Sequence, residues 1–178
     1  MRVFEYKAYA NAEQYAAIDE AIRTTQFVRN KCIRLWMDAK DTSYNVGMKE
    51  ISKHTTELRA DYPWAKKLNS TAVQAAGDRA WESISRFYKN LREGIKPVGY
   101  PRFRKTVRSV EYKQYGWKLR LPETGERILS RITFKDGFGP CRATRVHVSG
   151  VFQRRGDGEE GALHKEAPLS VRVGDGQG

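Results

Sequence analysis

Residues 99–120 read Gly-Tyr-Pro-Arg-Phe-Arg-Lys-Thr-Val-Arg-Ser-Val-Glu-Tyr-Lys-Gln-Tyr-Gly-Trp-Lys-Leu-Arg. The stretch carries seven cations against one acid, Glu111, and five aromatic residues lie among them. Cations neutralise phosphates, and flat rings offer faces to unpaired bases. A solvated surface needs the charge without the rings, and a core needs the rings without the charge. Both together predict a surface that binds nucleic acid.

The residues around this stretch predict a change from helices to strands. Lys96-Pro97 and Gly99-Tyr100-Pro101 interrupt regular structure and indicate a connector. Beyond it, apolar and charged residues alternate at 110–112, 117–121 and 132–135, as expected of antiparallel strands with one solvated face. Residues 2–9 near the start of the chain alternate in the same way and predict another strand.

The first predicted helix covers residues 12–40. Apolar residues recur there at three- and four-residue spacing, which forms one stripe along a helix. Asn11 stands before it and Gln14 follows three residues later, an approximate capping box. The Asn side chain can accept hydrogen bonds from the free amides of the first turn, so the helix should begin there.

Two further helices are predicted before the connector. Residues 48–59 have an apolar inner face, and Tyr62-Pro63 ends that helix because the residue before a proline avoids the helical region. A third helix begins at one of several capping residues at 69–71 and ends at Gly94. The chain is therefore predicted to place a helical block between strands.

Composition limits the classes of function. The chain has 178 residues, 39% of them hydrophobic, with a formal charge of +12 and a pI of about 9.8, which favours a polyanionic partner. Cys32 and Cys141 lie far apart, so neither a zinc knuckle nor a disulfide framework is expected. We expect no signal peptide, no membrane-spanning segment and a cytoplasmic location.

The last segment, residues 141–178, differs from the rest in composition. It has no Tyr and no Trp, and it holds seven of the fifteen glycines. This composition predicts a disordered tail without a role in folding. A tail read in a shifted frame and an ordinary flexible tail both remain open as its origin.

Three motifs, in order along the chain, resemble the N-terminal half of the TnpB (OrfB) family, transposon-encoded proteins ancestral to type V CRISPR effectors. They are Arg-Thr-Thr-Gln-Phe-Val-Arg-Asn-Lys-Cys at 23–32, Leu-Asn-Ser-Thr-Ala-Val-Gln-Ala-Ala at 68–76, and Gly-Tyr-Pro-Arg-Phe-Arg-Lys at 99–105. The last is the most specific. The resemblance extends over about residues 1–138.

The resemblance implies an α+β fold, in which an oligonucleotide-binding-like β-barrel, the wedge, is interrupted by a helical recognition domain. The expected divisions are 1–10 for the first wedge strand, 11–94 for the recognition domain, 95–140 for the remaining wedge strands and 141–178 for the tail. In the family both domains bind a guide RNA and the duplex beside the target.

By this resemblance, the third helix reaches the DNA motif that flanks the target. Ser70 and Gln74 are the best candidates, with Asn69 and Thr71 nearby, and Arg79 is expected on phosphate. An amide side chain can both donate to and accept from one adenine edge, which suits Gln74 to base reading. A solvent-facing helix residue without such a role is the alternative for Gln74.

The connector, by the same resemblance, lies near guide RNA and heteroduplex. The candidate RNA-binding residues are Tyr100, Arg102, Phe103, Arg104, Lys105 and Arg108. The arginines would contact phosphates and the rings would stack on bases. Tyr100 and Phe103 could instead pack in the seam of the barrel, and Trp117 is expected in the core.

The family's RuvC-like nuclease uses three carboxylates and magnesium, and it should follow Gly139. No strand with the first carboxylate and no paired CxxC zinc ribbon is found there, so we expect a truncated chain. The resemblance then implies no catalytic residue and no metal in this chain, with magnesium and zinc belonging to the missing portion.

The expected partners are a guide RNA and a double-stranded DNA target, bound by a monomer in the cytoplasm in association with the nucleoid. A small helix-turn-helix DNA-binding regulator, with its recognition helix within 12–93, is the alternative from another class. An unrelated enzyme using Glu111, Glu123 and Glu126 is a third reading, although nothing pairs those acids with a base or a metal site.

Overall fold

The computed structural model describes residues 7–40, 42, 44–120, 130–138, 144–149 and 169–172. Its helices are α1 (Ala12–Ala39), α2 (Met48–Asp61), α3 (Ser70–Arg92) and the 3-10 helix η1 (Ala65–Lys67). Its strands are β1 (Lys7–Tyr9), β2 (Ser109–Tyr112), β3 (Trp117–Arg120), β4 (Ser130–Phe134), β5 (Thr144–Ser149) and β6 (Leu169–Arg172). The fold is α+β and mostly helical.

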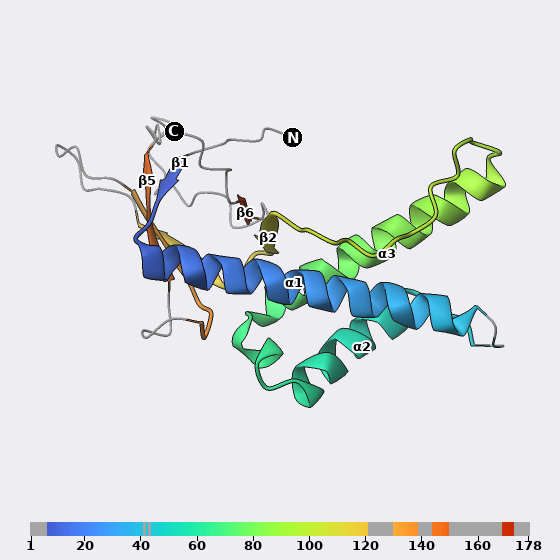
Figure 1. Ribbon diagram of the computed structural model, residues 1–178, viewed down its shortest axis with the longest axis horizontal. Coiled ribbons are helices and arrows are strands. Elements are labelled where there is room, and N and C mark those ends of the chain that lie inside the picture. Colours follow the sequence, from blue (N-terminus) through green and yellow to red (C-terminus); the bar gives the residue numbers. More distant parts are fainter. Residues whose placement is uncertain are drawn as a thin grey trace, which may run out of the picture.

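The strands form two small antiparallel sheets. One has the order β1-β5-β4-β3, and the other pairs β2 with β6. In the described residues β1 and β3 are the two edges of the larger sheet, which does not close into a barrel. Figure 1 shows the strands gathered near the N-terminal end of α1, while α2 and α3 extend beside that helix.

The helix boundaries agree closely with those predicted from the sequence. The backbone amides of Asn11 and Gln14 each donate to the other residue's side chain, at 2.8 Å in both directions, so the predicted capping box is confirmed. Gly94 follows α3 with a φ of 66°, a conformation that favours glycine at the end of a helix. The predicted strand at 2–9 is described only from Lys7, because residues 1–6 lie outside the described part.

The segment 141–178 requires a correction. β5 lies between β1 and β4 in the larger sheet, and β6 pairs with β2. The prediction of a tail without a role in folding is therefore wrong for residues 144–149 and 169–172. The rest of 141–178 lies outside the described residues, so the prediction of disorder is not tested there.

The hydrophobic core lies where the three helices meet and continues to the first strand after the connector. Ile33 and Val28 of α1, Ile51 of α2 and Ile84 of α3 are fully or almost fully buried. Val110 and Tyr112 of β2 and Phe134 of β4 extend the same cluster. Trp117 is partly buried and packs against the core, as expected.

Small residues let α3 approach its neighbours closely. Gly77 is buried on α3, and a Cβ placed there would lie 2.8 Å from Cγ2 of Thr55 and 3.4 Å from Cγ2 of Ile51 on α2. Carbon atoms rarely approach within 3.0 Å. The absence of a side chain at this position therefore sets the distance between α2 and α3.

We expect Gly77→Ala to lower the free energy of unfolding by up to about 2 kcal/mol, because overpacking a close contact costs about 1–3 kcal/mol and the gain in helix propensity is only roughly 1 kcal/mol. Urea denaturation followed by circular dichroism measures the change. Thr55→Ser removes the methyl group that the new Cβ would meet and keeps the hydroxyl that bonds to the carbonyl oxygen of Ser52 at 2.7 Å. The double variant should recover most of the loss; if it does not, the clash with Thr55 is not the cause.

Candidate nucleic-acid interface

The connector, residues 93–108, runs from the end of α3 to the start of β2. Side chains of α1 hold it against α1. Asn30 donates from Nδ2 to the carbonyl oxygen of Arg104 and accepts from the amide of Arg104, at 2.9 Å in each case. Gln26 donates to the carbonyl oxygen of Lys105 at 2.9 Å and accepts from the amide of Val107 at 3.1 Å. The two amide side chains thus pair with the backbone as a neighbouring strand would.

This pairing leaves the side chains of the connector at the surface. Arg102, Phe103, Arg104 and Lys105 are all exposed. Phe103 is 45% exposed, and the guanidinium carbon of Arg34 lies 5.9 Å from the centroid of its ring. Because α1 fixes the backbone, three cations and one ring are presented along a segment with little freedom to rearrange. Such a surface suits phosphates and unpaired bases.

Tyr100 occupies a different environment from the other predicted RNA-binding residues. Its ring centroid lies 5.4 Å from those of Trp36 and Phe87. The ammonium of Lys40 lies 4.5 Å from the centroid of the Tyr100 ring. Tyr100 therefore joins an aromatic cluster between α1 and α3, which is not the barrel-seam packing given as its alternative, and the residue remains 42% exposed. Arg108, the last of the predicted set, is exposed at the start of β2.

Four of the five predicted DNA-contacting residues lie at the start of α3, where their contacts divide them into two pairs. The backbone amide of Asn69 donates to Oδ1 of Asp136 at 2.8 Å, and its side chain accepts from the amide of Thr71 at 3.0 Å. The hydroxyl of Thr71 donates to the carbonyl oxygen of Tyr115 at 2.6 Å. Asn69 therefore joins the start of α3 to the segment after β4, and Thr71 joins it to the turn before β3.

Ser70 and Gln74 form the second pair, and both are exposed. They stand four residues apart on α3, so they lie on the same face of the helix one turn from each other. Nothing that the structure describes engages the amide of Gln74. A hydroxyl and an amide on one exposed helical turn can reach the edge of a base.

Arg79 is committed to an ion pair. Its Nη2 lies 2.7 Å and its Nε 2.9 Å from Oε2 of Glu111, with both side chains about three-quarters buried. At the preceding residue of α3, Oδ2 of Asp78 lies 2.5 Å from Nζ of Lys113. The two pairs join α3 to β2 and the residue after it, so Arg79 positions the strand rather than standing free for a phosphate.

Sequence reasoning missed Gln26, Arg29 and Asn30 as a group. They stand at i, i+3 and i+4 on α1 and all three contact the connector, Arg29 through a hydrogen bond from Nη1 to the carbonyl oxygen of Arg102 at 3.2 Å. The available signal was the spacing of three long or amide side chains on one face of an amphipathic helix, beside its apolar stripe.

Arg29 is the most unusual of these residues. It is 9% exposed, and its pKa is lowered, first by burial and then by the neighbouring charges of Arg104 and Arg79. Burial likewise raises the pKa of the Cys32 thiol to about 12, so that side chain stays protonated and unreactive at neutral pH. The guanidinium of Arg29, unlike the thiol, does not lose its proton in a protein and therefore stays charged when buried.

In the described part of the chain, no group of three His, Cys, Asp or Glu side chains is placed to hold a metal ion. The helices in that part include none with the length and apolarity needed to cross a membrane. Comparison with models of known protein families and with curated proteins gives no match to this chain.

Proposed function

We propose that this chain is the nucleic-acid-binding N-terminal part of a TnpB-like RNA-guided DNA endonuclease, and that it binds without cutting. The observation that carries the proposal is the connector, whose backbone is paired with α1 while Arg102, Phe103, Arg104 and Lys105 face solvent. A fixed row of cations and one exposed ring suits a single strand, which offers both phosphates and unstacked bases.

The proposal divides the work between two surfaces. The connector, with Arg108 beside it, binds guide RNA, and the exposed turn of α3 with Ser70 and Gln74 contacts the duplex that flanks the target. The strands around the connector belong to an oligonucleotide-binding-like wedge, into which residues 11–94 are inserted as the recognition domain. The net charge of +12 supports both contacts, because it attracts polyanions over the whole chain.

The test is the salt dependence of RNA binding. We expect Arg104→Gln/Lys105→Gln to reduce the slope of log K against log salt by about 1.4 for single-stranded RNA, since each neutralised phosphate contributes about 0.7. Affinity at low salt should fall about tenfold. Filter binding or fluorescence anisotropy with a structured RNA and with a random duplex measures both quantities.

The matched control is Lys49→Gln/Lys53→Gln, which removes two exposed charges from α2 instead. It should leave the slope close to that of the unmodified chain. Equal effects of the two double variants would mean that net charge alone drives binding. Tighter binding to a palindromic duplex than to RNA, by a dimer, would support the helix-turn-helix regulator instead.

A further inference from the structure

Arg29 combines burial, positive charge and the lack of a carboxylate partner. Only 9% of the residue is exposed. Its hydrogen bonds use Nη1 alone, to the carbonyl oxygen of Arg102 at 3.2 Å and to Oδ1 of Asn30 at 3.4 Å. Both acceptors are neutral. Among the residues that the structure describes, no acid forms an ion pair with it.

The cations around Arg29 make burial of its charge more unfavourable. Arg104, whose backbone Asn30 holds on both sides, and Arg79 on α3 are the cations that act on it. Arg79 is itself bonded to the carboxylate of Glu111. A buried charge without a counterion is destabilising, and like charges beside it add to the penalty.

A purely structural role does not need the charge of Arg29. A neutral side chain with an N–H group could donate to the carbonyl oxygen of Arg102, and that carbonyl belongs to an exposed residue that water can reach. The planar guanidinium has five N–H donors, and those on Nη1 account for the hydrogen bonds described. The remaining donors and the uncompensated charge are what an anion would use.

We propose that Arg29 and Arg104 together bind one phosphate group of the nucleic-acid backbone, which supplies the counterion that the folded chain lacks. The proposal rests on the function proposed above and deepens it, because it adds the buried Arg29 to a phosphate contact made by Arg104 of the exposed row. Arg29 is held by its hydrogen bond to the connector, and the backbone of Arg104 is held by Asn30, so both arginines project from backbone that is fixed in place.

If Arg29 binds phosphate, Arg29→Met should have two effects together that replacement of a purely structural residue would not have. Methionine fills similar volume without charge, so the slope of log K against log salt for single-stranded RNA should fall by about 0.7, the share of one phosphate. The melting temperature should stay level or rise by about 2–4 °C, because a buried unpaired charge is removed. A variant with an unchanged salt slope would overturn the proposal, and so would one whose slope falls only together with its melting temperature.

Inorganic phosphate provides an arm of the test that is independent of nucleic acid. At matched ionic strength, phosphate in place of chloride should raise the melting temperature of the unmodified chain by about 2–4 °C more than that of Arg29→Met, because a ligand of the folded state stabilises it by mass action. The comparison between variants removes the general effect of phosphate on burial. Arg29→Lys, which keeps the charge but loses the fork, should retain only part of the added stabilisation.

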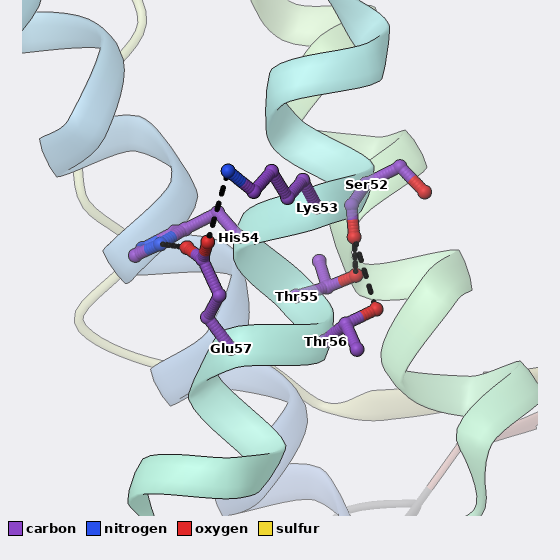
Figure 2. A network of polar contacts seen from close by, with 6 residues as sticks. All are labelled: Ser52, Lys53, His54, Thr55, Thr56 and Glu57. Carbon is purple, nitrogen blue, oxygen red and sulfur yellow. Dashed lines mark hydrogen bonds and ion pairs between the residues drawn. The ribbon is translucent and has the colours of Figure 1, made fainter.

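The control for both arms is Lys53→Met on α2. Figure 2 shows Lys53 and His54 on the same carboxylate, with Lys53 Nζ 3.6 Å and His54 Nδ1 3.5 Å from Glu57, so this cation already has a partner. In the view of Figure 1 the connector passes above α1, whereas α2 lies below α1. The control therefore removes a cation from a helix on the other side of α1 from the connector in that view.

The two arms separate failure of the site from failure of the proposed function. Equal stabilisation of all variants by phosphate overturns the phosphate site, whatever the RNA results. A response to phosphate that depends on Arg29, in a chain with no affinity for RNA or DNA, supports an anion site and rejects the nucleic-acid function and, with it, the backbone as the source of the phosphate.

Discussion

Replacing both Gln26 and Asn30 by Ala will release the connector from α1 and lower the affinity for RNA about hundredfold. The two side chains make four hydrogen bonds to the backbone of residues 104–107. At about 0.5–1.5 kcal/mol each, these four bonds together hold the connector in place by about 2–6 kcal/mol. Once they are lost, binding must order the segment first, and that ordering reduces affinity.

Trypsin reports the same release without any ligand. Arg102, Arg104 and Lys105 are cleavage sites with exposed side chains, but a backbone held by α1 cannot enter a protease. Cleavage of a transiently opened segment follows the population of the open state, so the double variant should be cut about a hundred times faster at these positions.

Thr56→Ala on α2 is the control for this experiment. Thr56 is exposed and donates to the carbonyl oxygen of Ser52 within its own helix, so its loss should leave cleavage at 102–105 unchanged. If the double variant is cut no faster than this control, the four hydrogen bonds do not hold the connector. If cleavage rises while RNA affinity is unchanged, the hydrogen bonds hold the connector but do not contribute to RNA binding.

The contrast between the helices and the connector shows which parts of the fold a sequence can predict. The helix at 12–39 was predicted to within a residue because its apolar period and its cap are both local. The pairing of Asn30 with Arg104 joins residues 74 positions apart, and no local pattern encodes it. The sequence shows which residues stand at positions 30 and 104, but it does not show that they lie next to each other in the fold.

Asn69 and Thr71 illustrate a second limit. The short polar side chains that read bases also cap helices and join turns, and composition does not distinguish these uses. Gly116 adds a clue that only the structure supplies: its φ is 99°, and a Cβ there would lie 2.5 Å from Oδ1 of Asn69. β5 was missed for a related reason, because its few alternating residues stand in a glycine-rich context that predicts disorder.

Asp136 will show the largest effect on stability. Its carboxylate is buried and accepts hydrogen bonds from the backbone amide of Asn69 and from the hydroxyl of Tyr112. Asp136→Ala leaves both donors without a partner, at about 1–3 kcal/mol each, so the free energy of unfolding should fall by about 4 kcal/mol. Because α3 begins at Asn69, the loss should loosen the joint between the helices and the strands. Chemical denaturation measures it.

Asp136→Asn distinguishes the hydrogen bonds from the charge. The amide keeps an oxygen for the Asn69 N–H, so this variant should lose much less stability than Asp136→Ala at neutral pH. Burial raises the pKa of Asp136 above its ordinary value, although the hydrogen bonds from Tyr112 and Asn69 oppose that rise. Removing the ionisable group should therefore change how stability depends on pH.

The direction of that change follows from proton binding. With a raised pKa in the folded state, the folded chain holds a proton that the unfolded chain has released. The contribution of Asp136 is fully present below its unfolded pKa and is lost as pH rises through its folded pKa. The unmodified chain should therefore gain stability over Asp136→Asn as pH falls from neutral toward 4, with Asp61→Asn at the exposed end of α2 as the control. A difference that does not vary with pH would mean that burial does not hold this proton, and the carboxylate would then act through its hydrogen bonds alone.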